Sequence, residues 1–146
     1  MGYTQYWRVK EDLPDFDEFA AIVMKIVSPY DGNGTRVFSN AVGKAVVSGS
    51  SVEIAGTYEP FYFHNKKQDF AFCKTAREPY DKYVTAILTA ALFKWGSELV
   101  VVSSDGDIED WEEGIEHYIN STGSNATKDD LKRMVQESFD TPWPSA

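Results

Sequence analysis

Residues 69–107 read DFAFCKTAREPYDKYVTAILTAALFKWGSELVVVSSDGD, and this stretch decides the fold. Residues 69–75 are apolar and aromatic with a polar end, and residues 79–95 carry apolar side chains at helical spacing. Residues 99–102 are a continuous branched apolar run of the kind that buried strands show. The pattern therefore predicts strand, helix, strand. A helix of this length between two strands of one sheet is the usual crossover, so we expect the two strands to be parallel.

The polar residues that follow these two strands would then lie at the same edge of the sheet, where open α/β sheets tend to bind ligands. The free amides at the start of the helix favour a phosphate or carboxylate, although Asp81 in the first turn could satisfy those amides itself. The candidate ligand-binding residues are Lys74, Thr75, Arg77, Tyr80, Asp81, Ser103, Ser104 and Asp105. An alternative is that Arg77 pairs with Asp105 or Asp81 and only ties the two loops together.

The remaining sequence predicts one α+β domain over residues 1–139 and a C-terminal tail over residues 140–146, whose Trp143 could dock on a neighbouring subunit. We expect a mixed, mostly antiparallel sheet with one βαβ crossover and helices packed mainly on one face. A strand is predicted at Tyr3–Val9, and an antiparallel meander is predicted within residues 36–64. Helices are predicted at Pro14–Val27, from Ile108 to Ile119 and from Thr127 to Ser138. Asp31 to Gly34 are predicted to form a turn.

Composition limits the class of partner. A formal charge of −9 repels a nucleic-acid backbone, so we expect no duplex binding, although a local pair such as Lys74 and Arg77 can still attract a small anion. No apolar run could span a bilayer and no signal peptide is evident, so we expect no membrane association and a cytoplasmic location, or the host cytoplasm for a viral protein. We also expect a homo-oligomer.

Few residues suggest a cofactor, a metal ion or catalysis. One cysteine and two histidines leave too few soft ligands for a zinc site, and the acids of residues 105–113 lack calcium-loop spacing. Cys73 lies on a predicted buried strand, where we expect it to pack as a small hydrophobe, although His64 could approach it. We therefore assign no catalytic residue, no metal ligand and no cofactor.

Several motifs resemble an uncharacterised family of small phage and bacterial proteins. They are MGYTxYW at Met1 to Trp7, FCKTA at Phe72 to Ala76, PYD at Pro79 to Asp81, and SSDG at Ser103 to Gly106 before Trp111. The chain departs from the family pattern at Gln5, where histidine is commoner, and at Glu78, where lysine is commoner. The resemblance implies no activity. The phage association suggests small viral proteins that sequester the nucleotide signals of host defence systems.

Three functions follow from these observations. The first is binding of a small phosphorylated or nucleotide-like ligand, such as a cyclic nucleotide or an ADP-ribose-type signal, without chemistry. The second is an acidic protein-binding inhibitor of a host factor. The third is a small hydrolase or transferase with Asp105 as base or Cys73 as nucleophile, for which no nucleophile elbow or metal triad is evident. We place binding before catalysis.

Overall fold

The computed structural model describes residues 3–28, 31–32, 37–40 and 43–142. Within them the chain forms eight strands, four α-helices and one short 3-10 helix. In chain order these are β1 (Thr4–Val9), α1 (Phe16–Ile26), β2 (Asp31–Gly32), β3 (Val37–Asn40), β4 (Gly43–Val47), β5 (Ser51–Gly56), β6 (Phe61–His64), β7 (Gln68–Lys74), α2 (Asp81–Trp95), β8 (Val100–Ser104), the 3-10 helix η1 (Ile108–Trp111), α3 (Glu112–Thr122) and α4 (Lys128–Phe139).

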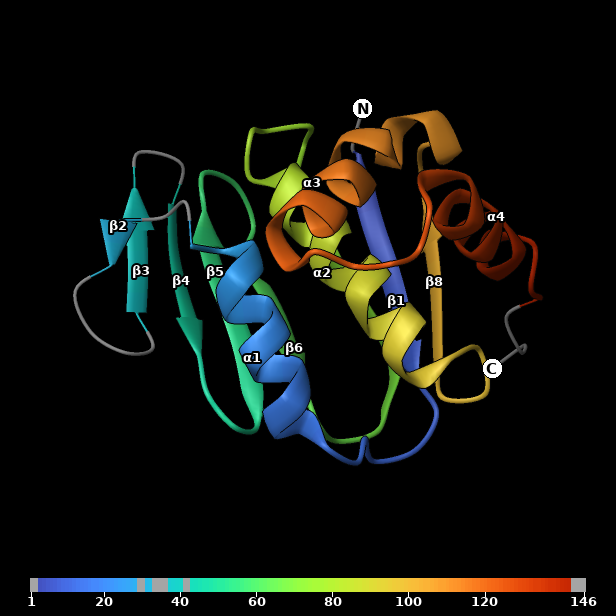
Figure 1. The fold of residues 1–146 in the computed structure, drawn as a ribbon, viewed down its shortest axis with the longest axis horizontal. Helices are drawn as coiled ribbons and strands as arrows, with labels where there is room; N and C mark the ends of the chain where they lie inside the picture. The colour runs from blue at the N-terminus through green and yellow to red at the C-terminus, as the bar shows by residue number, and fades with distance from the viewer. Residues whose placement is uncertain (1–2, 29–30, 33–36, 41–42, 143–146) are drawn as a thin grey trace.

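The strands pair into two antiparallel sheets, one in the order β7-β1-β8 and one in the order β2-β3-β4-β5-β6 (Figure 1). α2 connects β7 to β8, as predicted. Both strands run antiparallel to β1, so they are parallel to each other, but β1 lies between them. The predicted parallel relation of the two strands and the helix between them is therefore confirmed, but the predicted mixed sheet is wrong, because every described strand pairs antiparallel with its neighbours. The N-terminal strand takes the hydrogen bonds that the two strands would otherwise exchange.

The five-stranded sheet contains the antiparallel meander expected within residues 36–64, since β3 to β6 pair in chain order. Along β5 the inward residues Val52 and Ile54 are buried, whereas Glu53 and Ala55 are exposed, as an alternating pattern predicts. Asp31–Gly32, predicted to open a turn, instead form the short strand β2 against β3. Residues 33–34 of that predicted turn lie outside the described part of the chain.

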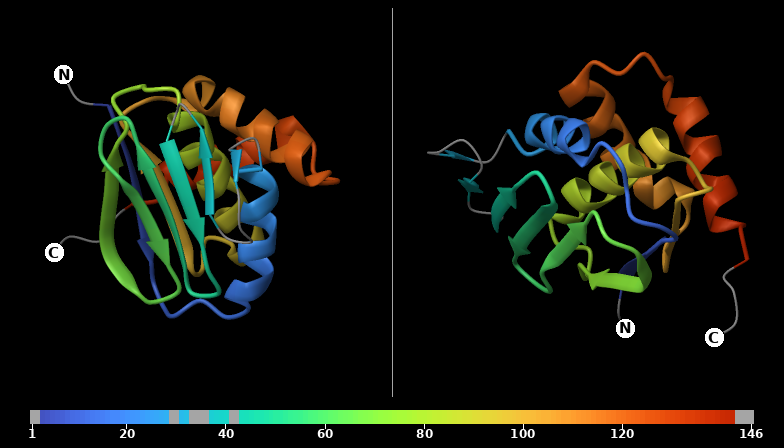
Figure 2. Two further views of the ribbon diagram at one scale, coloured as in Figure 1. Left: turned by 90° about the vertical axis from the view of Figure 1, so that its left-hand side faces the viewer. Right: turned by 90° about the horizontal axis from the view of Figure 1, so that it is seen from below.

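α2 is the central helix. The sequence predicts one wide apolar stripe, whereas every residue from Tyr83 to Leu92 is buried. The reason is that α1, α3 and α4 all contact α2, and so does strand β8. α3 comes especially close at Gly114, where any side chain would overlap Thr85. Figure 2 shows the helices gathered on one side of the strand layer, leaving the other side of the β7-β1-β8 sheet without a helix.

The helix ends follow local sequence signals with one exception. α2 ends at Gly96, whose φ of 76° favours glycine, and the side chain of Thr127 caps α4 by accepting a bond from the amide of Asp130 at 3.1 Å. Pro79 was expected at the first helical position, but the helix begins two residues later, at Asp81. None of the described helices is long and apolar enough to cross a membrane.

α4 closes the free edge of β8. The hydroxyl of Ser138, which is buried, accepts a hydrogen bond from the amide of Val102 at 2.8 Å and donates one to its carbonyl at 3.3 Å. A strand edge left with unpaired backbone groups could pair with another chain, so this contact protects the edge. α4 ends at Phe139, and residues 143–146 of the predicted tail, Trp143 included, lie outside the described residues.

Candidate functional site

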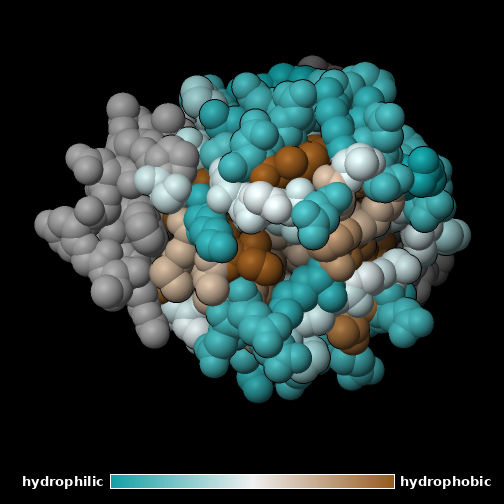
Figure 3. Space-filling model, in the orientation of Figure 1, coloured by the Kyte–Doolittle hydropathy of each residue, from teal (hydrophilic) through white to brown (hydrophobic). Residues whose placement is uncertain are grey.

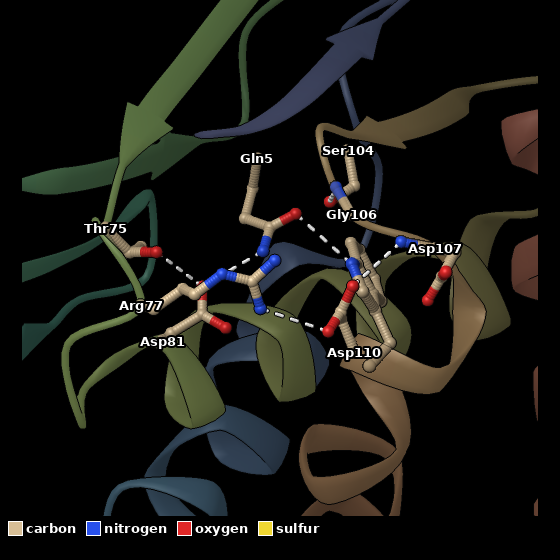
Figure 4. A network of polar contacts seen from close by, with 9 residues as sticks. Gln5, Thr75, Arg77, Asp81, Ser104, Gly106, Asp107 and Asp110 are labelled. Atoms are coloured by element: carbon tan, nitrogen blue, oxygen red, sulfur yellow. Dashed lines mark hydrogen bonds and ion pairs between the residues drawn. The ribbon is translucent and has the colours of Figure 1, made fainter. Parts of the chain in front are cut away.

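The pairing register brings the candidate residues to one end of the three-stranded sheet. Thr4 lies opposite Lys74 on β7, and Gln5 lies opposite Ser104 on β8. The carboxyl ends of β7 and β8 therefore flank the start of β1, and α2 and η1 begin just beyond them (Figure 4). We call this end of the sheet the crevice. Its two sides are separated by the width of β1, so the polar residues of β7 and β8 are not direct neighbours.

A partly buried carboxylate lies at the centre of the crevice. Oδ1 of Asp81 accepts hydrogen bonds from the hydroxyl of Thr75 at 2.6 Å and from the amide nitrogen of Gln5 at 3.0 Å. The oxygen of the Gln5 amide accepts a third bond, from the indole nitrogen of Trp111 at 3.2 Å. Gln5, Thr75 and Trp111 are all fully buried. Gln5 thus joins β1 to α2 and η1, and Asp81 joins α2 to Thr75, the residue that follows β7.

Burial decides the acid–base behaviour of Asp81. It raises the pKa of the carboxyl above its ordinary value of 3.8, although the bonds from Gln5 and Thr75 and the nearby charge of Arg77 act in the opposite direction. The carboxylate accepts its hydrogen bonds from Gln5 and Thr75, whereas the sequence suggested that it could satisfy amides of the first turn of α2. The Asp81 side chain points instead toward Gln5 on β1 and Thr75 after β7, so a negative group already lies beside the predicted anion site.

Arg77 lies at the mouth of the crevice. Its guanidinium carbon is 4.0 Å from the centre of the Tyr3 ring, and Nη1 donates to Oδ1 of Asp110 at 3.1 Å. The predicted alternative partners, Asp105 and Asp81, are thus replaced by an acid of η1. This bond is the largest cause of the raised pKa of Arg77. The pKa of Asp110 is lowered, first by the hydrogen bond from the Asp107 amide and then by the Arg77 guanidinium. The Arg77 side chain is 60% exposed.

The backbone beneath Arg77 is unusual. Ala76 and Arg77 both have positive φ, 55° and 59°, in succession and without a glycine. Residues with a side chain avoid this left-handed region at a cost of roughly 1–2 kcal/mol each. The amide of Ala76 donates to the carbonyl of Tyr3 at 3.1 Å, which holds the turn against β1. Strain of this kind tends to persist where a site requires a particular orientation.

Asp105 extends the pairing of β8 with β1. Its amide donates to the carbonyl of Thr4 at 3.0 Å, and its carboxylate accepts from the Thr4 amide at 3.1 Å and from the Tyr6 hydroxyl at 3.0 Å. Ser104 accepts a bond from the amide of Gly106 at 3.0 Å, and Ser103 lies opposite Tyr6. These three predicted ligand residues thus shape the loop before η1, and the Asp105 carboxylate already holds two donors.

Tyr80 is a packing residue in this structure. The sequence suggested that it could present its ring to a ligand, but the side chain is fully buried and its hydroxyl donates to the carbonyl of Glu59 at 2.5 Å. The ring lies against Gly56, where any side chain would overlap it. Lys74 lies on the same side: its amide donates to the Glu59 carboxylate at 2.9 Å, and its ammonium is 5.4 Å from the ring of Tyr58.

Cys73, the one nucleophile considered from the sequence, is not favoured by the geometry. Burial raises the pKa of the Cys73 thiol to about 12, so the thiolate is scarce at neutral pH. Its sulfur is 3.4 Å from the carbonyl of Glu59, while Nδ1 of His64 accepts a bond from the amide of Lys66 at 3.2 Å. Within the described residues, no group of three or more His, Cys, Asp or Glu side chains is placed to hold a metal ion.

Sequence reasoning overlooked Gln5 and Asp110 as members of the site. Gln5 could have been predicted to be buried, because the alternation along β1 places it on the same face as Trp7 and Val9. A polar side chain on a buried face must find partners, and here they are Asp81 and the Trp111 indole. No local pattern indicated Asp110, which lies 33 residues from Arg77.

Comparisons with known proteins add no identification. No protein-family model matches this chain, and neither does any curated protein or solved structure. The resemblance of its motifs to phage and bacterial proteins therefore stays a prediction.

Proposed function

We propose that the protein is a non-catalytic binding protein for a small phosphorylated or nucleotide-like ligand, bound at the mouth of the crevice. The observation that supports this most directly is the placement of Arg77. Two strained residues in succession hold its guanidinium over the ring of Tyr3, where more than half of the side chain stays open to solvent. A guanidinium fixed on an aromatic platform is suited to bidentate binding of phosphate.

In the proposed complex, two cationic side chains bind the ligand phosphate and the other residues of the site hold them in position. Arg77 exchanges its exposed ion pair with Asp110 for a ligand phosphate, and Lys74 approaches the same phosphate from β7. An exposed ion pair contributes little, roughly 0–1 kcal/mol, so its exchange costs little. Thr75, Tyr80 and Asp81 keep their internal hydrogen bonds and position the two cations, and Ser103, Ser104 and Asp105 form the opposite wall. Sequestration of a nucleotide-derived signal of host defence, as the motif resemblance implies, requires only binding.

Thermal unfolding tests this proposal. Purified protein is heated with cyclic oligonucleotides, cyclic ADP-ribose isomers, mononucleotides and NAD. A ligand at 100 times its dissociation constant stabilises by about 2.7 kcal/mol, which shifts the midpoint by roughly 5–10 °C for a domain of this size.

The matched control uses a second exposed arginine. Arg133 is 66% exposed and pairs with Asp130 at 3.2 Å, much as Arg77 pairs with Asp110. The ligand shift should disappear in Arg77→Ala and persist in Arg133→Ala. No shift with any member of the panel, in protein that unfolds cooperatively, would contradict the proposal, and so would a shift that Arg77→Ala retains.

A second candidate function, binding to a protein partner, is favoured by one observation. Phe70 and Phe72 of β7 are 59% and 54% exposed on the sheet face that carries no helix, next to Tyr6 of β1. Exposed aromatic side chains that cluster on one face are typical of protein interfaces. An acidic inhibitor that uses this face would lose its partner on Phe70→Ser with Phe72→Ser, whereas Arg77→Ala would leave the complex intact. Co-precipitation from host lysate with both variants distinguishes the two functions.

A further inference from the structure

A pocket of about 380 Å³ lies on the helical side of the molecule, away from the crevice. It is bounded by α1, by the last turns of α2 and α3, and by the α3–α4 connection. Its lining residues are Ile22, Lys25, Phe93, Tyr118, Thr122, Gly123, Ser124, Asn125 and Ala126. The volume falls in the range of sites for small organic molecules. In Figure 1 the α3–α4 connection crosses in front of α2, and Figure 3 shows apolar surface gathered at the middle of the same face.

The inner part of the pocket is aromatic. The rings of Phe93 and Tyr118 lie with their centres 6.4 Å apart, and Ile22 and Ala126 are partly buried beside the core. Tyr118 is buried, whereas Phe93 is 51% exposed, although the ten residues that precede it on α2 are all buried. An apolar group in the pocket would cover the Phe93 ring, so the body of the ligand should be apolar and flat or narrow.

The described residues that line the pocket carry one positively charged side chain, Lys25, and no negatively charged one, although the protein is strongly acidic. The described residues that line it include no Asp or Glu, whereas the whole chain has 23 acidic and 14 basic residues. Lys25, in the last turn of α1, makes no ion pair with a described residue, unlike Lys94, Lys128 and Lys132. The side-chain amide of Asn125 likewise makes no hydrogen bond to a described residue and can donate to a bound anion.

We propose that this pocket binds a small amphipathic organic anion, with an aromatic or narrow alkyl body against Phe93 and Tyr118 and one carboxylate between Lys25 and Asn125. The pocket shares no residue with the crevice, so this site is independent of the proposed phosphate ligand. The local charge selects an anion over a cation, and the exposed ring selects an apolar body over a sugar or a peptide backbone.

The test uses two probes of nearly equal shape that differ in charge, 1-naphthoate and 1-naphthylmethanol. Each is titrated into the 15N-labelled protein while amide chemical shifts are followed, and the Gly123 amide reports on the pocket. Naphthoate should bind saturably with a dissociation constant below about 1 mM, and the alcohol should bind more weakly. Lys25→Met keeps the apolar stem and removes the charge, so it should weaken naphthoate about tenfold and change the alcohol less than about twofold.

Two matched controls accompany these variants. Phe93→Ala should weaken both probes, whereas Phe72→Ala removes an equally exposed ring elsewhere and should change neither. Lys66→Met removes an exposed charge from the β6–β7 turn and should also change neither. The proposal is overturned if the folded protein shows no saturable shift, if Lys25→Met affects both probes equally, or if Phe93→Ala leaves both affinities unchanged.

Discussion

Replacing Gln5 by leucine should destabilise the protein more than any other change of one buried polar side chain in the crevice. The side chain is fully buried and makes two hydrogen bonds, one to the Asp81 carboxylate at 3.0 Å and one from the Trp111 indole at 3.2 Å. Leucine has a similar volume, so the substitution should leave no large cavity. It leaves the partly buried Asp81 carboxylate with one donor fewer and the buried Trp111 indole N–H without its acceptor.

The magnitude follows from the two bonds. A bond to a charged group contributes roughly 1.5–3 kcal/mol and a neutral one roughly 0.5–1.5 kcal/mol. The free energy of unfolding should therefore fall by about 2–4 kcal/mol, out of a total of roughly 5–15 kcal/mol for a domain of ordinary stability. The thermal midpoint should fall by roughly 5–15 °C.

The loss should depend on pH in a defined direction. Burial already raises the pKa of Asp81 above 3.8, and Gln5 is one of the groups that opposes this rise. In Gln5→Leu the folded-state pKa rises further, so the folded state binds a proton more tightly than the unfolded state does. Stability then falls as the pH increases from the ordinary aspartate pKa through the folded-state value. The difference between wild type and variant should be smaller below pH 3.8, where the carboxyl is neutral in both states.

Urea denaturation followed by circular dichroism measures the effect at neutral pH and in acid. Gln136→Leu is the matched control, because the Gln136 amide donates to a carboxylate, Asp140, at 3.2 Å, but in an exposed position. That variant should change the free energy of unfolding by less than about 0.5 kcal/mol. The reasoning would be refuted if Gln5→Leu stayed within about 0.5 kcal/mol of wild type at neutral pH, or if its deficit grew on acidification.

Three further predictions concern Ser138, Gly114 and Cys73. Ser138→Ala should lower the free energy of unfolding by about 1–3 kcal/mol in urea denaturation, because the Val102 amide at the covered edge of β8 loses its partner; an unchanged value would mean that the hydroxyl does not protect that edge. Gly114→Ala should also destabilise, by about 1–3 kcal/mol, because the new methyl group would overlap Thr85. At an exposed helical glycine the same substitution would stabilise the protein, because alanine favours helices by about 1 kcal/mol. A gain in thermal stability in Gly114→Ala would therefore contradict the close approach of α2 and α3. Cys73, with a thiol pKa of about 12, should react with Ellman's reagent at pH 8 at least about 100-fold more slowly in the native protein than in urea, and equal rates would argue against its burial.

Much of the fold follows from local patterns. Strand β1, the meander from β3 to β6, and helices α1 and α4 lie close to their predicted bounds, because periods of two and 3.6 reflect which side chains face the core. Thr127 and Gly96 mark helix ends through interactions within a few residues. These features need no knowledge of the rest of the chain.

Two differences between the predicted and the observed fold share one cause. The inserted strand β1 separates β7 from β8, and α2 is buried on nearly all sides and not along a stripe. Each depends on a segment distant in sequence, since β1 comes from the N-terminus and the cover of α2 comes from three other helices. A pattern read along one segment indicates that the segment is buried, but not which segments surround it.

For the candidate site, local patterns were enough to predict that Lys74 to Asp81 and Ser103 to Asp105 lie at the ends of two strands that run in the same direction. The contacts of their side chains depend on the packing of the whole chain. Asp81 receives the amide of Gln5, 76 residues away, and Arg77 pairs with Asp110, 33 residues away. Partners at such separations are selected by packing, because a partly buried carboxylate takes whichever donors the folded chain brings within reach, and the sequence near Asp81 does not name them.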